Sequence, residues 1–334
     1  MVSAMEYRNL GKSGLKLSTF SFGSWVTFGS QMDDAPAMDC MILAYERGVN
    51  FFDNAEVYNK GESELIMGRA FKKLGWGRDT FCVSSKVFWG GEKPTQYGLS
   101  RKHVFDACHA ALKRLQVDYL DLYFCHRPDI HTPIEETVWA MNDLIRQGKV
   151  IYWGTSEWNA QQLTEAFLVA RENRLIGPTM EQPEYNLFHR DRVESELLPI
   201  YKSYGLGTTI WSPLASGILT GKYSAGIPTD SRLNVPGYEW LKERYGTEDG
   251  RAKIAKAQKL GEIAKDLGIS TAQLSLAWCA KNPHVSTVIL GASKKAQLEE
   301  NLKAIDALGK LTPEIMQQIE AVVLNKPEGP KDFS

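Results

Sequence analysis

Short apolar runs alternate with amphipathic stretches along almost the whole chain. The apolar runs have the length and composition of buried β-strands, and they cover residues 19–24, 50–54, 80–87, 120–125, 151–156, 180–185, 207–211 and 287–291. Apolar residues recur at helical spacing between them, which predicts helices over residues 35–47, 62–74, 101–115, 135–147, 160–172, 193–204, 251–267 and 271–281. Strands that alternate with helices in this way form a parallel sheet covered by helices.

The spacing of the strands favours a closed barrel. Residues at the predicted strand ends recur roughly every 30 positions; they are Asp53, Lys86, His126, Ser156, Gln182 and Ser212. We therefore predict an α/β fold in which residues 1–334 form a single (β/α)8 TIM barrel. A doubly wound open sheet is the competing fold, but a dinucleotide-binding sheet of that kind carries G-x-G-x-x-G after its first strand, and the sequence lacks this motif.

Three segments fall outside the repeat. Residues 1–17 predict an N-terminal β-hairpin that covers the barrel floor, with its turn at Gly11–Gly14. Residues 214–250 form a long loop after strand 7, and loops of this length in compact domains are usually functional. Residues 326–334 are polar and contain two prolines, so we expect a loose tail.

Composition narrows the class of protein. The formal net charge is -1, which argues against nucleic acid as a partner because such binding needs a basic excess. The five cysteines show no paired spacing, as expected in a reducing compartment. No segment has the pattern of a signal peptide or a membrane helix, so we expect a cytoplasmic protein.

The predicted strand ends bring together side chains that suit proton donation. Active sites of (β/α)8 barrels lie at the carboxyl ends of the strands, where we place Asp53, Lys86 and His126, with Tyr58 on the loop after Asp53. A phenol has an ordinary pKa of about 10, and a neighbouring cation lowers that value. We expect Lys86 to be this cation and Asp53 to keep it charged, while His126 binds a substrate oxygen. The group suits reduction of a carbonyl to an alcohol.

Each of these residues also has a purely structural interpretation. An Asp53–Lys86 pair is often only a structural ion pair at a barrel mouth, and Tyr58 and His126 are each compatible with a structural role. A metal site at His126, Asp129 and His131 is disfavoured, because the spacing matches no common site. We expect no metal.

A second candidate region lies near the carboxyl terminus. The last predicted strand runs into Gly291 and then into a helix that begins near Ser293, Lys294 and Lys295. A helix amino terminus with lysines attracts anions, and the loops after strands seven and eight are the usual phosphate site of this barrel. An ordinary capped surface helix would show the same local pattern.

The combined motifs resemble the aldo-keto reductases. FFDNAEVY, SSKV, HRPD, WGTSEW, EQPEYN, WSPLASGILTGKY and GASKKAQLEEN occur in the family's order and span nearly the whole chain. The runs KVFWGG, TPIEET and YWGTSEW look closest to the branch that contains the β subunits of voltage-gated potassium channels and their plant and microbial relatives.

The resemblance implies a catalytic tetrad, a cofactor and a substrate pocket. The tetrad is Asp53, Tyr58, Lys86 and His126, and the cofactor is NADPH/NADP+. The substrate pocket is lined by Trp25, Tyr58, Trp89 and His126. The cofactor-binding residues are Ser24, Trp25, Gln31, Asp53, Ser156, Gln182, Trp211, Ser212, Pro213, Leu214, Ala215, Ser216, Lys222, Arg232, Gly291, Ser293, Gln297, Glu300 and Asn301. Positive charge from Arg232, Lys294 and Lys295 would favour NADPH over NADH.

The resemblance also leaves two functions open. One is NADPH-dependent reduction of small carbonyl compounds by a homo-oligomer, most simply a tetramer. The other is regulation of a membrane potassium channel, with NADPH as a redox sensor. Two departures bear on this choice: His126 stands where animal channel subunits have asparagine, and Glu157 stands where they have arginine. The histidine and the short segment before the first hairpin favour the enzyme.

Overall fold

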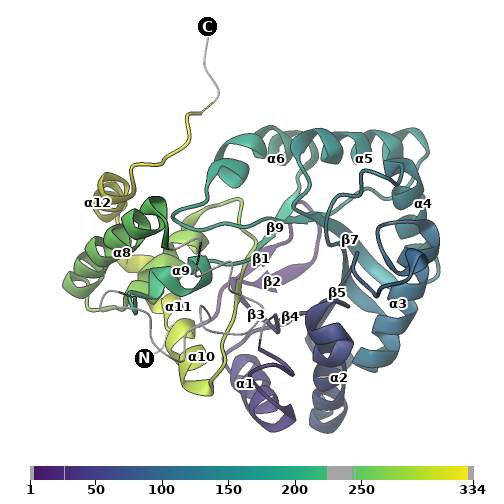
Figure 1. Ribbon diagram of the computed structural model, residues 1–334, viewed down its shortest axis with the longest axis horizontal. Coiled ribbons are helices and arrows are strands. Elements are labelled where there is room, and N and C mark those ends of the chain that lie inside the picture. Colours follow the sequence, from purple (N-terminus) through teal and green to yellow (C-terminus); the bar gives the residue numbers. More distant parts are fainter. Residues whose placement is uncertain (1–3, 26, 224–242, 244–245, 330–334) are drawn as a thin grey trace, which may run out of the picture.

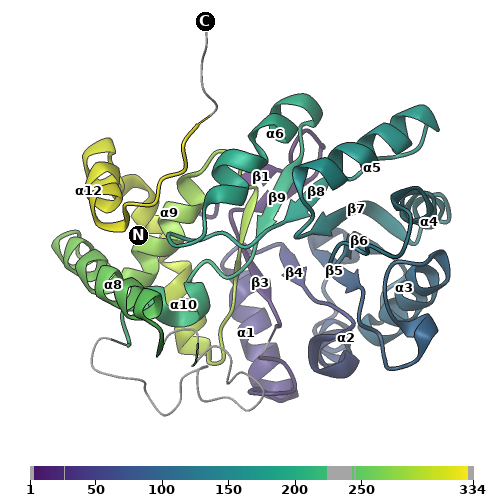
Figure 2. The same cartoon turned by 45° about the horizontal axis from the view of Figure 1, so that its top comes forward.

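The computed structural model describes residues 4–25, 27–223, 243 and 246–329. A closed barrel of parallel strands lies at its centre, in the order β10-β3-β4-β5-β6-β7-β8-β9, and the helices surround it (Figures 1 and 2). The predicted (β/α)8 barrel is therefore confirmed. The barrel strands are β3 (Phe20–Gly23), β4 (Phe51–Asp53), β5 (Cys82–Val87), β6 (Leu120–Cys125), β7 (Val150–Ser156), β8 (Met180–Gln182), β9 (Gly207–Ile210) and β10 (Thr287–Leu290).

The helices connect the strands and cover the outside of the barrel. Those between β3 and β9 are α1 (Asp34–Glu46), α2 (Glu62–Leu74), α3 (Arg101–Leu115), α4 (Ile134–Arg146), α5 (Ala160–Glu172) and α6 (Leu198–Tyr204). The later ones are α8 (Glu248–Asp266), α9 (Thr271–Lys281), α10 (Lys295–Leu302), α11 (Ala304–Ala307) and α12 (Pro313–Val323). None of these described helices combines the length and the apolar character that a membrane span requires.

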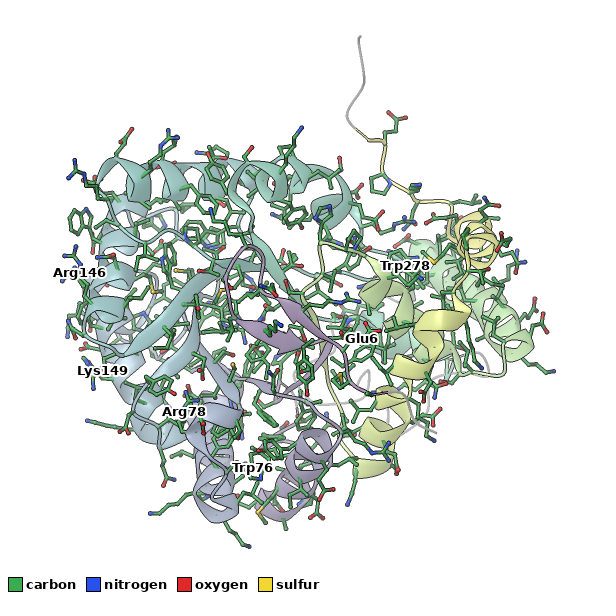
Figure 3. The ribbon with its side chains drawn as sticks, turned by 180° about the vertical axis from the view of Figure 1, so that it is seen from behind. Glu6, Trp76, Arg78, Arg146, Lys149 and Trp278 are labelled. Atoms are coloured by element: carbon green, nitrogen blue, oxygen red, sulfur yellow. The ribbon has the colours of Figure 1, made fainter. Side chains whose placement is uncertain are left out.

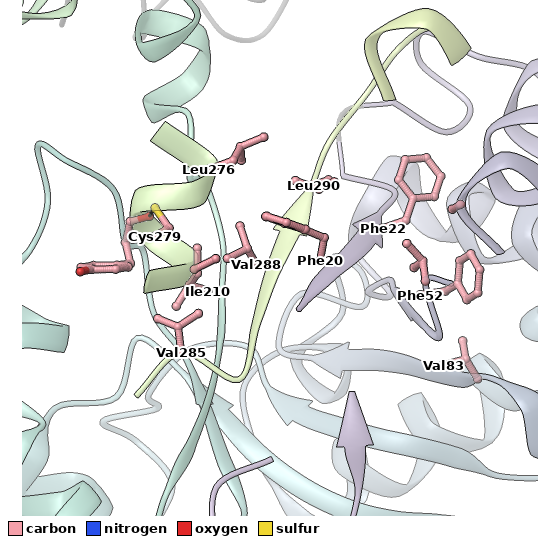
Figure 4. Packing of buried hydrophobic residues seen from close by; sticks show 14 of the residues in the cluster. Phe20, Phe22, Phe52, Val83, Ile210, Leu276, Cys279, Val285, Val288 and Leu290 are labelled. Atoms are coloured by element: carbon pink, nitrogen blue, oxygen red, sulfur yellow. Dashed lines mark hydrogen bonds between the residues drawn. The ribbon is translucent and has the colours of Figure 1, made fainter. Parts of the chain in front are cut away.

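Each strand sends alternate side chains to two different cores. Phe52 and Val83 belong to the large core between strands and helices, whereas Phe51 and Cys82 belong to a small core inside the barrel. This alternation is the period of two that any β-strand imposes. Figure 4 shows part of the outer core, where Ile210 and Val288 and residues of α9 such as Leu276 and Cys279 are drawn together.

The predicted hairpin is present and covers one end of the barrel. It consists of β1 (Tyr7–Asn9) and β2 (Lys16–Ser18), paired antiparallel, and it crosses the middle of the barrel in the view of Figure 3. Leu10 and Leu17 contribute to the inner core, so the hairpin closes the barrel floor with apolar side chains. Gly11 has φ +55, and a Cβ there would lie 2.3 Å from the Gly205 carbonyl oxygen, so only glycine fits this approach.

The boundaries of several predicted elements differ from the structure. A 3-10 turn at Arg78–Thr80 delays the start of β5, and a π-helical turn at Arg192–Glu196 replaces the first part of the helix predicted over residues 193–204. Helix α8 starts earlier than predicted because Thr247 caps it, with its side chain accepting from the Gly250 amide. The long loop predicted over 214–250 begins with a 3-10 turn at Ala215–Thr220, and most of its remainder lies outside the described residues.

Candidate active site

The two-residue alternation that divides apolar side chains between the two cores also turns polar side chains into the barrel at its carboxyl end. Asp53 lies two residues past Phe51 of the inner core, and Lys86 lies four past Cys82, so both point into the barrel. The same spacing relates His126 to Leu122, and Gln182 to Met180, which are also inner-core residues. The polar side chains of the candidate site therefore occupy the last inward-facing positions at the carboxyl ends of these strands.

The predicted tetrad is assembled around the buried ammonium of Lys86. Its Nζ lies 2.6 Å from Asp53 Oδ2, 3.1 Å from the Tyr58 hydroxyl and 2.8 Å from the Asn54 carbonyl oxygen. Ser84 Oγ donates to Asp53 Oδ1 at 2.8 Å, which fixes the carboxylate from its other side. The His126 ring centroid lies 5.8 Å from that of Tyr58. The four side chains thus form one contiguous group.

The electrostatics of the group favour a neutral histidine beside a paired lysine. Burial lowers the pKa of His126 well below its ordinary value, and the cations of Lys86 and Arg127 lower it further, so the imidazole is neutral at neutral pH. Burial also lowers the pKa of Lys86, while the Asp53 carboxylate opposes this shift and favours the ammonium form. His126 Nδ1 is buried with no hydrogen-bond partner among the described residues, and the residue itself lines the cavity, where a ligand can contact the ring.

A cavity of about 680 Å³ extends from this group across the barrel mouth. Its wall includes Asp53, Tyr58 and His126, and most of the predicted cofactor and substrate residues. These are Trp25, Gln31, Trp89, Ser156, Gln182, Trp211, Ser212, Pro213, Leu214, Ser216, Lys222, Gly291, Ser293, Gln297, Glu300 and Asn301. The volume lies within the range of ordinary ligand sites.

Two of the predicted cofactor residues, Ser24 and Ala215, are described by the structure but do not line the cavity. Ser24 is fully buried and its hydroxyl donates to the Asp53 carbonyl oxygen at 3.0 Å, so its side chain supports the strand end rather than the cavity. Ala215 is buried beneath the loop after β9. Arg232 lies outside the described residues.

The loop after β9 has a strained backbone at the cavity wall. Ser212, Ala215 and Ser216 all have left-handed φ values, 55, 46 and 56, although none is glycine. Gly217 follows with φ 99. Left-handed residues other than glycine are uncommon, and runs of them concentrate at binding sites. This loop, together with the nearby Lys222, fits a phosphate-bearing cofactor in both polarity and position.

The start of α10 forms the far end of the cavity. Ser293, Gln297, Glu300 and Asn301 line it. Gln273 Nε2 donates to Glu300 Oε1 at 2.7 Å and so orients that carboxylate. The side chains of Lys294 and Lys295 are exposed and do not line the cavity.

The structure also gives contacts for Glu157 of the WGTSEW run and for Asn186 of the EQPEYN run. Glu157 accepts a hydrogen bond from the Trp211 indole nitrogen at 2.9 Å and another from the Glu184 amide at 2.7 Å. It therefore anchors the indole from outside the cavity. Asn186 likewise stays behind the wall, where its amide donates to the Ser212 carbonyl oxygen at 3.0 Å. Both contacts join segments that follow different strands.

Sequence reasoning missed several residues of the cavity wall. Arg127 is the charged residue among them. The uncharged ones include Thr27, Val57, Thr220, Ser270, Ala272, Leu276, Ile289 and Leu290. Arg127 follows His126 directly in the HRPD run, so its position at a strand end was the available signal. Within the described part of the chain, no cluster of three or more His, Cys, Asp or Glu residues is arranged to hold a metal ion.

A closed barrel with this polar group at the carboxyl ends of its strands is the architecture of a barrel enzyme. The sequence matches the profile of the Aldo/keto reductase family over residues 19–324, and the chain belongs to that family. It is accordingly an oxidoreductase. It is 54% identical over 330 residues to a protein of Oryza sativa subsp. japonica described as "Probable voltage-gated potassium channel subunit beta", covering 98% of this chain and 100% of that one. A protein of Arabidopsis thaliana with the same description is 53% identical over 330 residues, with the same coverage.

Proposed function

We propose that the protein is an NADPH-dependent reductase of aldehydes and ketones, with Tyr58 as the proton donor. The observation that supports this proposal is that Lys86 Nζ lies 2.6 Å from Asp53 Oδ2 and 3.1 Å from the Tyr58 hydroxyl, so that the ammonium connects the two side chains. It ends at a cavity that His126 also lines. A phenol held against a buried ammonium is poised to release its proton, because the cation stabilises the phenolate that remains.

The side chains divide the reduction between them. The substrate carbonyl oxygen lies between the Tyr58 hydroxyl and the neutral His126 imidazole, which holds it by a hydrogen bond. NADPH, when bound, would supply the hydride equivalent for the carbonyl carbon, and Tyr58 would give its hydroxyl proton to the carbonyl oxygen, so that the carbonyl becomes an alcohol. Lys86 then faces a phenolate and stabilises it, while Asp53 keeps the lysine charged. Solvent returns the proton to Tyr58 before the next turnover.

The cavity wall carries residues suited to holding an extended NADPH. Trp211 would stack on the nicotinamide, and Ser156 and Gln182 would bind its carboxamide. Ser212, Leu214, Ser216 and Lys222 would hold the pyrophosphate, and Ser293, Gln297, Glu300 and Asn301 would hold the adenosine end. The observation that supports this assignment is that all of these residues line the same cavity.

A spectrophotometric assay tests the proposed function. Purified protein is mixed with NADPH and a panel of aromatic and short-chain aldehydes, ketones and quinones, and the loss of cofactor absorbance is followed. We expect turnover with several aldehydes. The absence of turnover with every carbonyl compound in the panel would contradict the proposal.

We expect the protein to bind NADPH more tightly than NADH. The 2′-phosphate distinguishes the two cofactors, and Lys294 and Lys295 provide positive charge at the start of α10. A preference of about tenfold or more in dissociation constant is expected from one charge-assisted contact. Titration of the intrinsic tryptophan fluorescence with each cofactor measures this preference. Equal dissociation constants would show that the residues around the adenosine end do not recognise the 2′-phosphate.

Regulation of a membrane potassium channel is the second candidate function. The descriptions of the rice and Arabidopsis relatives favour it. We expect a homotetramer under either function, and light scattering on the purified protein measures its mass; a monomer would refute the tetramer. Co-expression with a candidate channel separates the functions, because a stable complex without turnover of any carbonyl compound would favour the channel role.

A further inference from the structure

Arg127 places a positive charge at the substrate end of the cavity. It follows His126 directly, is half-buried and lines the cavity wall. Its guanidinium carbon lies 5.6 Å from the Trp89 ring centroid and 5.9 Å from that of Trp211. The cation therefore lies near the aromatic surfaces that border the reacting group.

The described partners of Arg127 are all neutral. Its Nη1 donates to the His126 carbonyl oxygen at 2.5 Å and to Ser156 Oγ at 3.3 Å. A guanidinium offers five N–H donors in a planar fork. Within the described residues its Nε and Nη2 groups make no hydrogen bond, so one edge of the fork remains for a ligand.

The charge of Arg127 is also not balanced within the cavity. The nearest catalytic acid, Asp53, is already paired with Lys86 at 2.6 Å. Glu300 belongs to the far end, where Gln273 holds it. No ion pair joins Arg127 to a carboxylate in the part of the chain that the structure describes. Its field reaches the catalytic group, because it lowers the pKa of both His126 and Lys86.

Burying part of a charge without a counter-ion costs free energy, and binding of an anionic ligand offsets that free energy. Resting on the proposed reductase function, we propose that Arg127 binds a carboxylate of the substrate, so that the preferred substrates are flat carbonyl compounds that also carry a carboxylate group. Trp25 and Trp89 provide the flat walls. A carboxylate matches the planar fork with two parallel hydrogen bonds, which fixes the carbonyl relative to Tyr58 and His126.

A matched pair of substrates tests this selectivity. 3-Carboxybenzaldehyde carries the anion, and its methyl ester keeps the aldehyde and the ring but removes the charge. We expect kcat/KM of the wild-type protein to favour the acid, and the ratio of acid to ester to fall by about tenfold or more in Arg127→Met. The change should appear mainly in KM of the acid. Arg127→Lys keeps a charge without the fork and should give an intermediate ratio.

Arg171→Met is the matched control, because Arg171 is an exposed residue of α5 that does not line the cavity. Its ratio of acid to ester should equal that of the wild type. An unchanged ratio in Arg127→Met would overturn the proposal, and so would an equal loss for both substrates together with weaker NADPH binding, which would assign Arg127 to the cofactor. If the wild-type protein reduces neither aldehyde nor any other carbonyl compound, the reductase function itself fails instead.

Discussion

Tyr58→Phe is expected to abolish carbonyl reduction while NADPH still binds. The substitution removes only the hydroxyl that lies 3.1 Å from Lys86 Nζ. General acid catalysis contributes about 10²- to 10⁴-fold to such a step, so kcat should fall by that factor. The proton moves only in the transition state, and for this reason the dissociation constant of NADPH should stay within about threefold of the wild-type value.

Tyr152→Phe provides the control for this variant. Tyr152 packs against the inner core near the barrel floor and does not line the cavity, so the loss of its hydroxyl should leave kcat unchanged. Steady-state assays with one aldehyde and fluorescence titrations with NADPH distinguish the possible results. Activity within tenfold of the wild type in Tyr58→Phe would identify another proton donor, and loss of NADPH binding would give Tyr58 a different role.

The fold was predictable because a barrel repeats one simple unit. Every strand alternates its side chains, so inner-core residues such as Phe51 and Leu122 also determine which later residues face the cavity. A polar residue two or four positions past an inner-core residue is then at the mouth. The positions of Asp53, Lys86 and His126 follow from this spacing relative to the inner-core residues, and their side chains lie together in the structure.

The contacts across strands were not predictable from local pattern. Glu157 meets Trp211 over a separation of 54 residues, and nothing in either run indicates the pair. The resemblance implied a cofactor contact for Ser24, yet its hydroxyl donates to the Asp53 carbonyl oxygen and its side chain does not line the cavity. The direction of the Arg127 side chain could not be predicted in this way. Strand alternation indicates where a side chain points only along a strand, and Arg127 lies one residue beyond the inward-facing His126. Such details depend on how neighbouring loops pack.

Lys86→Met is expected to remove reductase activity as well, with a fall in kcat of about 10²-fold or more. The methionine fills a similar volume but leaves no cation beside the Tyr58 hydroxyl. The phenolate that forms on proton transfer then loses its stabilising partner. Steady-state assays of kcat measure the loss, and Lys72→Met, which changes an exposed lysine of α2, should match the wild type.

Stability must be separated from chemistry in this variant. Lys86 is fully buried, and its removal leaves the Asp53 carboxylate buried, with hydrogen bonds from Ser84 and Gln182 as its remaining side-chain partners among the described residues. Breaking a buried ion pair on one side costs about 3–5 kcal/mol of folding free energy. We therefore expect a lower thermal midpoint for Lys86→Met.

The double variant Lys86→Met with Asp53→Asn resolves the ambiguity. It removes the unpaired charge while the asparagine oxygen can still accept from Ser84, so the free energy of unfolding should rise above that of Lys86→Met alone. Activity should not return, because the cation beside the phenol is still absent. A double variant that regains both stability and turnover would show that Lys86 serves only to hold Asp53, and the phenolate-stabilising role assigned to the lysine would be wrong.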